Sequence, residues 1–93
     1  MDKFNDTDIM VLGVILKHGK ENGASLNNGI VIDDILHVIK DKSIARIRNS
    51  IKLLLSYCYI TEGVKVGRKK TYVINEKGIE FLKDIKKNII NVN

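Results

Sequence analysis

The sequence predicts an α+β fold that is mainly helical, formed by one domain of 93 residues. In four separate segments, apolar residues recur at three- and four-residue spacing, which indicates four amphipathic helices. Between the third and fourth of these segments the pattern becomes alternating around a polar turn, which indicates a β-hairpin. The hydrophobic content of 44% and charged content of 29% are ordinary for a globular chain and exclude a disordered one.

The first helix is expected near residues 7–18, after the candidate N-cap residues Asn5 to Asp8. Residues 20–29 are rich in Gly and Asn and are expected to form a loop. They lack the spacing of Gly, Lys and Ser or Thr that a phosphate-binding loop requires. Ile30 to Ile32 is a β-branched run that we expect to add one short strand.

The second helix is expected to start at Ile32 or Asp33 and to continue to Ile39, and only Lys40 to Ser43 separate it from the third. Two amphipathic helices joined by so short a connection form a helix-turn-helix, here about residues 32–57. Ser43 is positioned to cap the third helix with its hydroxyl oxygen. The apolar stripe of that helix consists of Ile44, Ile47, Ile51, Leu54 and Leu55.

The face of the third helix away from this stripe is polar and basic. Its members are Ala45, Arg46, Arg48, Asn49, Ser50 and Lys52. The segment from Lys40 to Lys70 holds nine basic and two acidic residues, a balance of +7, against +5 for the whole chain. The remaining residues therefore sum to −2, and the basic segment is expected to face an anionic partner.

The hairpin is expected over about residues 59–74, with the basic turn Gly67 to Lys70 at its tip. Asn75 is a suitable N-cap for a last helix of about residues 76–90, with Phe81 beside its apolar stripe. The order helix, short strand, helix, turn, helix, hairpin, helix is that of a winged helix-turn-helix. It has a three-helix core, a two- or three-stranded wing and a C-terminal helix.

Two stretches resemble winged-helix transcriptional regulators, and the likeness extends over about residues 43–85. Ser50 to Ile60 is similar to the end of their recognition helix and the first wing strand, and Tyr72 to Gly78 is similar to their second wing strand and the entry to the final helix. The resemblance is to small archaeal winged-helix proteins, both transcriptional regulators and chromatin-associated dimers, and MarR- and PadR-type regulators share the core. Cys58 departs from the pattern, because Gly commonly ends the helix there.

In a winged helix the exposed face of the third helix enters the major groove of DNA. Arg46 and Asn49 are the leading candidates for base contacts, because Arg can bond guanine, and Asn adenine, through two hydrogen bonds. Lys42, Ser43 and Lys52 are expected on phosphates. The complete predicted DNA-binding set is Lys42, Ser43, Ala45, Arg46, Arg48, Asn49, Lys52, Lys65, Arg68, Lys69 and Lys70.

Three functions are compatible with these features. The first is a sequence-specific transcriptional regulator that binds double-stranded DNA, and the second is a sequence-independent chromatin or replication-associated DNA-binding protein. The third is a winged helix that binds RNA or an acidic protein. An enzyme is not expected, because no carboxylate pair, nucleophile–base set or metal-ligand spacing is present. We likewise expect no catalytic residues, cofactor, metal or small-molecule ligand.

The single cysteine, Cys58, cannot form an intramolecular disulfide and is expected to be a small buried side chain. The N-terminal residues are too polar for a signal peptide, and the apolar run from Ile9 to Leu16 is too short to cross a bilayer. A cytoplasmic protein without membrane contact is expected.

The last helix carries more apolar residues than a small core requires. A chain of this size buries roughly 60–65% of its unfolded surface, so association would add stability. We expect a homodimer in which the end of the last helix meets the first helix of a second copy, and which binds a pseudo-palindromic site. The predicted interface residues are Ile85, Ile89, Ile90 and Val92.

Overall fold

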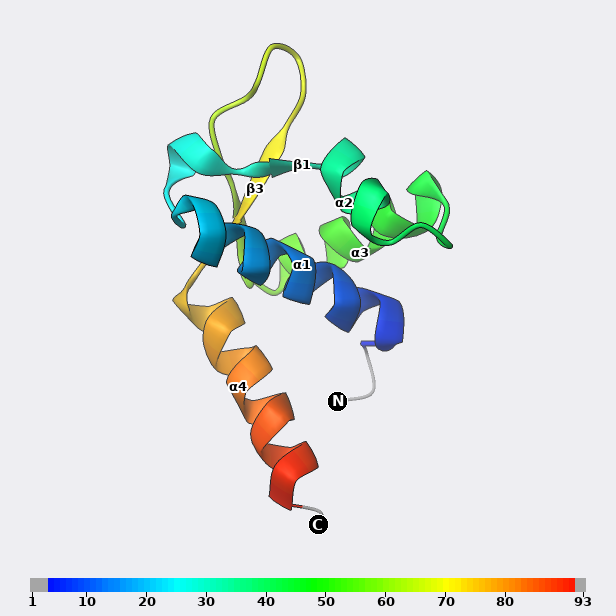
Figure 1. Cartoon of the computed structure of the whole chain (residues 1–93), viewed down its shortest axis with the longest axis vertical. Helices are drawn as coiled ribbons and strands as arrows, with labels where there is room; N and C mark the ends of the chain where they lie inside the picture. The colour runs from blue at the N-terminus through cyan, green and yellow to red at the C-terminus, as the bar shows by residue number, and fades with distance from the viewer. Residues whose placement is uncertain (1–3, 92–93) are drawn as a thin grey trace.

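The computed structural model describes the backbone of residues 4–91 and the side chains of residues 4–87. Helices and strands follow one another in the predicted order (Figure 1). They are α1 (Asp6–Asn22), η1 (Leu26–Asn28, a 3-10 turn), β1 (Ile30–Val31), α2 (Ile32–Val38), α3 (Ile44–Ser56), β2 (Ile60–Glu62), β3 (Thr71–Ile74) and α4 (Glu76–Asn91). The predicted winged helix-turn-helix architecture is confirmed, and its sheet has three strands.

The core lies where α1 crosses α3 and packs against β3. The most deeply buried apolar side chains are Val11, Leu12, Ile15, Ile35, Ile47 and Leu54. The predicted apolar stripe of α3 is therefore confirmed over most of its length. Ile44 is the exception, with 41% of its surface exposed. It stands in the first turn of α3 and lines a surface cleft beside α2 and the wing.

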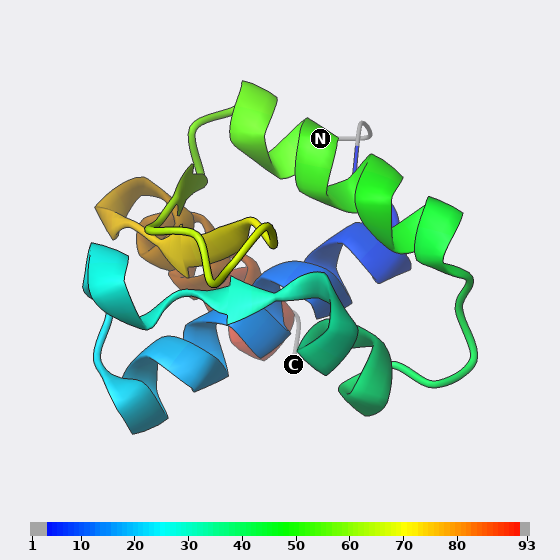
Figure 2. The ribbon, with the colours of Figure 1, turned by 90° about the horizontal axis from the view of Figure 1, so that it is seen from above.

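The sheet is antiparallel with the strand order β1-β3-β2, and β3 is buried at all four positions. Viewed from above, α3 runs along one side of the hairpin, and β1 leads directly into α2 (Figure 2). The pairs Ile30↔Tyr72 and Ile60↔Ile74 fix the register of the two outer strands against β3. The wing thus stays attached to the core through the strand that precedes α2.

The first wing strand is shorter than the expected residues 59–66. The strand ends at Glu62, the Gly63 N–H makes a last bond to the Thr71 carbonyl of β3 at 3.0 Å, and the backbone groups after it have other partners. The Val64 N–H donates to the Leu26 carbonyl at 2.8 Å, and the Thr71 hydroxyl donates to the Val64 carbonyl at 2.9 Å. The chain then closes the tip through a bridge between Val66 and Lys69, with Gly67 at φ 63° between them. The wing is consequently an open loop above a short ladder (Figure 1).

Helix α1 continues to Asn22, beyond the predicted end near residue 18. The Asn22 side chain donates to the His18 carbonyl at 3.1 Å, and His18 Nε2 donates to the Asn28 carbonyl at 2.9 Å. Gly23, at φ 92°, then ends the helix. The last turn of α1 is held by these polar contacts and carries no apolar stripe. The end of the helix predicted from apolar periodicity was therefore too early. Helix α2 begins at Ile32, one of the two starting residues expected from the sequence.

Helix α3 ends in a Schellman motif centred on Cys58. The Tyr59 N–H donates to the Leu54 carbonyl and the Cys58 N–H to the Leu55 carbonyl, both at 3.0 Å. This arrangement needs a left-handed residue, and Cys58 supplies it with φ 62°. The expectation that Cys58 is buried is wrong, since the thiol is exposed at this helix end.

Helix α4 begins after Asn75, whose side chain bonds both the first turn of α4 and the end of α3. Its side-chain oxygen accepts the Gly78 N–H at 3.0 Å, which confirms the predicted N-cap, and its amide donates to the Cys58 carbonyl at 2.8 Å. Gly78 lies so close to the chain that a Cβ there would stand 2.2 Å from the Tyr59 carbonyl oxygen. Phe81 then stacks on Tyr59, with ring centroids 4.5 Å apart. The first turns of α4 are therefore fixed to the α3–β2 connection.

The predicted dimer interface is described only at its beginning. Ile85 is half-buried, whereas the side chains of Ile89 and Ile90 and all of Val92 lie outside the described residues.

We predict that Gly78→Ala lowers the free energy of unfolding by about 1–3 kcal/mol, because the added methyl group forces α4 away from Tyr59. Urea unfolding followed by circular dichroism measures the change. Gly13→Ala is the matched control. Gly13 lies within α1, and a Cβ there meets nothing within 4 Å beyond the backbone of its own helix. That variant should gain about 1 kcal/mol from helix propensity. Equal effects of the two substitutions would contradict the tight contact at Gly78.

We also predict that Cys58→Gly stabilises the protein by about 0.5–1 kcal/mol, because glycine adopts the left-handed conformation without steric cost. The midpoint of thermal unfolding should rise. Cys58→Ala keeps the Cβ and should leave the midpoint almost unchanged, so a gain in both variants would point to loss of the thiol instead.

Candidate nucleic-acid interface

The start of α3 is formed as the sequence predicts. The Ser43 hydroxyl accepts the Arg46 N–H at 3.1 Å and so caps the helix. With Ile47, Ser50 and Leu54 turned inward, the residues on the opposite side face solvent. The outward-facing residues of the predicted DNA-binding set on this helix are Ala45, Arg48, Asn49 and Lys52.

Arg46 does not belong to this outward face. Its Nη2 lies 3.1 Å from Oδ1 of Asp8 in α1, and the Ser50 hydroxyl donates to the same oxygen at 2.6 Å. The Asp8 side chain is 3% exposed and that of Arg46 is 30% exposed. The second Asp8 oxygen accepts the Asn5 N–H at 3.0 Å, within a reciprocal capping box. Arg46 therefore holds α3 against α1, and the guanidinium that the sequence analysis expected at a base is paired with Asp8 in this structure.

Sequence reasoning also placed Ser50 on the polar outer face, and the structure buries it completely. Arg46 and Ser50 are one helical turn apart, so both lie on the flank of α3 that faces α1. The spacing of Asn5 and Asp8 was a usable signal for the capping box. Nothing local in the sequence indicated that this carboxylate also bonds residues of α3.

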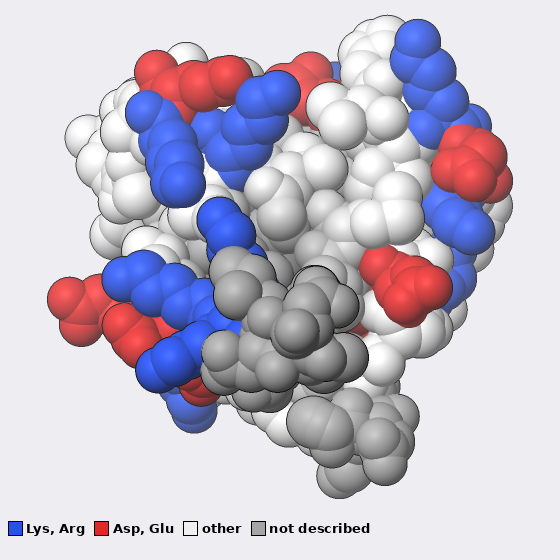
Figure 3. Space-filling view, turned by 60° about the horizontal axis from the view of Figure 1, so that its bottom comes forward, with Lys and Arg blue, Asp and Glu red and all other residues white. Residues whose placement is uncertain are grey.

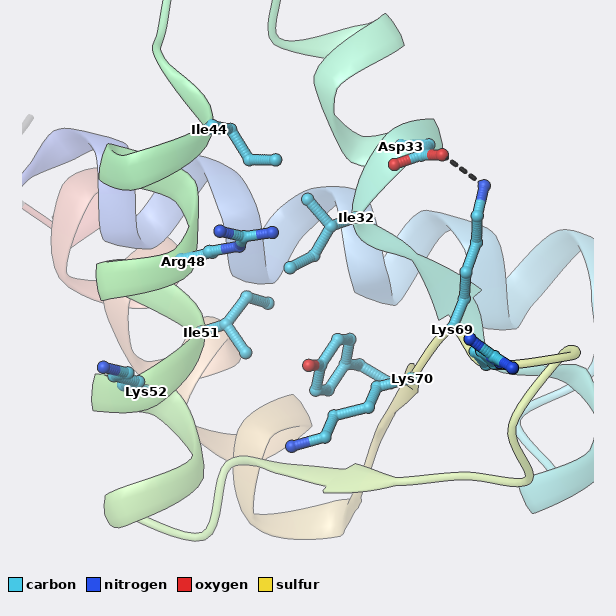
Figure 4. A pocket seen from close by; sticks show the side chains of 10 residues that line it. Ile32, Asp33, Ile44, Arg48, Ile51, Lys52, Lys69 and Lys70 are labelled. Atoms are coloured by element: carbon cyan, nitrogen blue, oxygen red, sulfur yellow. Dashed lines mark hydrogen bonds and ion pairs between the residues drawn. The ribbon is translucent and has the colours of Figure 1, made fainter.

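The other flank of α3 lines a cleft of about 520 Å³ that also involves the start of α2 and the wing (Figure 4). Arg48 extends from α3 into this cleft. Its apolar floor is formed by Ile32, Ile44, Ile51 and Tyr72. Its charged lining consists of Asp33, Arg48, Lys52, Arg68, Lys69 and Lys70. Five cations thus share the cleft with one carboxylate.

The charges around the cleft are partly paired. Lys69 donates to Asp33 across the gap between the wing and α2 (Figure 4). Lys70 lies 3.7 Å from Glu62. The hydrogen bond between Lys69 and Asp33 lowers the pKa of Asp33 and raises the pKa of Lys69, so both stay charged near neutral pH. Burial raises the pKa of Tyr72 further above the ordinary value of a phenol, which is already uncharged near neutral pH.

Five of the predicted DNA-binding residues therefore meet at one place, namely Arg48, Lys52, Arg68, Lys69 and Lys70. Lys42 is half-buried in the turn before α3, and Lys65 is exposed on the wing, and neither lines the cleft. Asp33 is the site residue that sequence reasoning missed. It was assigned only to the start of a helix, and its contact with Lys69 depends on where the wing folds.

Other parts of the surface carry mixed charge. In the view that brings the α4 end forward, Lys and Arg side chains are interspersed with Asp and Glu (Figure 3). Within the residues that the structure describes, no three His, Cys, Asp or Glu side chains form a group able to hold a metal ion. None of the described helices has both the length and the apolar character needed to cross a membrane.

Fold and cleft together define a winged-helix domain, and solved structures share this fold. A variant of MepR from Staphylococcus aureus superposes with a TM-score of 0.75 at 15% identity, covering 96% of this chain and 61% of that one. The protein AF1382 from Archaeoglobus fulgidus gives 0.75 at 16% identity, covering 98% and 92%. A MepR–DNA complex gives 0.73 at 15% identity, covering 96% and 62%.

One sequence relative is also found. The chain is 45% identical over 47 residues to the DNA-binding protein TubR of Clostridium botulinum C phage. This match covers 50% of the chain and 58% of the phage protein. No family model matches the sequence. The phage protein and the bacterial and archaeal proteins of the same fold show that the resemblance is not confined to archaeal proteins.

We predict that Arg46→Ala lowers the free energy of unfolding by about 2–4 kcal/mol, because it leaves the buried Asp8 carboxylate without its cation. Arg48→Ala removes the same type of side chain from the solvent side of α3 and should change stability by less than about 0.5 kcal/mol. Chemical unfolding of both variants measures the difference. Similar losses for the two variants would show that the Asp8 contact contributes little.

Proposed function

We propose that this chain is a winged-helix transcriptional regulator that binds double-stranded DNA with α3 in the major groove. The wing follows the adjacent backbone or minor groove. It acts as a homodimer joined through its N- and C-terminal helices, so that two copies of α3 contact the halves of a pseudo-palindromic site. The protein works in the cytoplasm and needs no cofactor.

The observation that carries this proposal is the meeting of two groups of cations at one cleft. Arg48 and Lys52 come from α3, and Arg68, Lys69 and Lys70 come from the wing. Phosphates of a DNA backbone are the extended anionic partner that such a surface fits. A MepR structure with the same fold is a DNA complex, and the TubR relative is named a DNA-binding protein.

Base contacts are assigned to Asn49 and Arg48. Asn49 is exposed on the outward face of α3, where its amide can bond both N6 and N7 of adenine. Arg48 takes the place first expected for Arg46, because its guanidinium is exposed beside the cleft and that of Arg46 is paired with Asp8. Ala45 leaves room for close approach to a base edge. The cations of the wing, with Ser43 and Lys42 at the start of α3, are assigned to phosphates.

The engagement of Arg46 with α1 favours a second candidate function. With Arg46 paired to Asp8, Arg48 and Asn49 are the exposed guanidinium and amide groups that the described part of α3 offers to a base edge. A surface with few base contacts and many lysines also suits sequence-independent coating of DNA, where phosphate contacts supply most of the affinity.

Selection from a pool of random DNA duplexes at moderate salt distinguishes these candidates. If the protein is a sequence-specific regulator, the selection enriches one motif. This motif is two-fold symmetric for a dimer and a single half-site for a monomer. A coating protein binds the pool without enriching a motif. Binding to RNA or acidic peptides in the absence of any duplex binding, even at low salt, would contradict both functions.

We predict that Asn49→Ala reduces the preference for the selected motif over random DNA by about 5- to 100-fold, because one base loses its paired hydrogen bonds. Arg68→Ala is the matched control on the wing. It should weaken binding to all sequences about equally and reduce the salt dependence by about one counterion. Titrations with motif and random duplexes at several salt concentrations measure both effects. An unaltered preference after Asn49→Ala would remove this residue from the base contacts.

A further inference from the structure

The wing carries cations that are already bonded to carboxylates of the same chain. Lys70 pairs with Glu62, the residue of β2 that stands opposite Tyr72 in the hairpin, so this pair stays within the wing. Lys69 instead pairs with Asp33 at the start of α2 (Figure 4). Asp33 is the one carboxylate among the described residues that line the cleft. Its bond therefore crosses the space in which a DNA backbone would lie.

We propose that Asp33 limits the affinity of the protein for DNA by occupying the wing cation that a phosphate would otherwise take. The inference rests on the proposed function and adds a residue that opposes binding. Carboxylate and phosphate oxygens are both acceptors for a lysine ammonium. While the Lys69 Nζ is bonded to Asp33, it is less available to a phosphate of the DNA backbone. Because the two anions repel each other, a phosphate competes with the Asp33 carboxylate for the Lys69 ammonium.

The exposure of the pair makes such an exchange feasible. The side chains of Lys69 and Asp33 are 60% and 57% exposed, so water surrounds both charges and the bond is weak. It lies at the rim of the cleft, above the apolar floor formed in part by Ile32 and Tyr72. A duplex approaching the cleft can therefore reach Lys69 without disturbing the buried core.

The remaining cations of the cleft show why one pair matters. Arg48, Lys52 and Arg68 have no carboxylate of a described residue within 4.0 Å. These three can meet phosphates directly, whereas Lys69 contributes only after exchange. Since each lysine newly available to a phosphate releases about one counterion, the state of Lys69 is visible in the salt dependence of binding.

Asp33→Asn tests the proposal, because it keeps the size of the side chain and removes its charge. Binding to a random-sequence duplex is measured at several salt concentrations. Affinity should rise about two- to fivefold at low salt, and the slope of log K against log salt should become steeper by about one. Circular dichroism verifies that the variant keeps the helical content of the parent.

Glu80→Gln is the matched control, because Glu80 pairs with Lys83 at 3.9 Å on α4 and neither residue lines the cleft. It removes the same charge and should leave the slope unchanged. The second arm repeats Asp33→Asn in a Lys69→Met background, where it should give no further gain. An equal gain there would mean that Asp33 repels phosphates without acting through Lys69, and would overturn the proposal.

The outcomes separate this inference from the proposed function. If the parent protein binds duplex DNA and Asp33→Asn has the same affinity and slope, the role of Asp33 is refuted and the DNA-binding function stands. If the parent protein does not bind duplex DNA at low salt, the proposed function fails and this inference fails with it.

Discussion

The buried carboxylate of Asp8 is the contact on which the position of α3 depends. It accepts hydrogen bonds from the Asn5 backbone, the Ser50 hydroxyl and the Arg46 guanidinium, and so joins the start of α1 to the middle of α3. A charge with a side-chain exposure of 3% is tolerated only when its oxygens are bonded in this way. Apolar packing between α1 and α3 could slide or rotate, whereas this set of directed bonds fixes one rotation of the helix.

That rotation decides which side chains α3 offers to a partner. With Arg46 and Ser50 turned to α1, the outward-facing side chains are those of Arg48, Asn49 and Lys52, and Arg48 and Lys52 also line the cleft beside the wing. The cationic cleft is a consequence, because it exists only if this flank of α3 faces the hairpin. Arg46 and Arg48 have the same chemistry and are two residues apart, yet one serves the core and the other the surface.

The wing and α4 are held by polar joints of a similar kind. Thr71, in the central strand, bonds the Val64 carbonyl and so shapes the base of the wing loop. Asn75 caps α4 while bonding the Cys58 carbonyl, which ties α4 to the end of α3. Lys69 and Asp33 add a weaker, exposed contact between the wing and α2. The framework is thus held by hydrogen bonds of buried or partly buried side chains, whereas the Lys69–Asp33 contact is exposed to solvent and can exchange.

The sequence by itself determined the order of the elements, the apolar stripe of α3 and the caps at Ser43 and Asn75. These features depend on residues a few positions apart, and local spacing records them. It also located the basic segment that supplies the cleft. Only the tertiary structure decided that Arg46 and Ser50 bond Asp8, that Lys69 bonds Asp33, and that Cys58 is exposed with a left-handed backbone. In the first two cases the partners are more than thirty residues apart. Their meeting depends on how helices and wing pack, which no local pattern encodes.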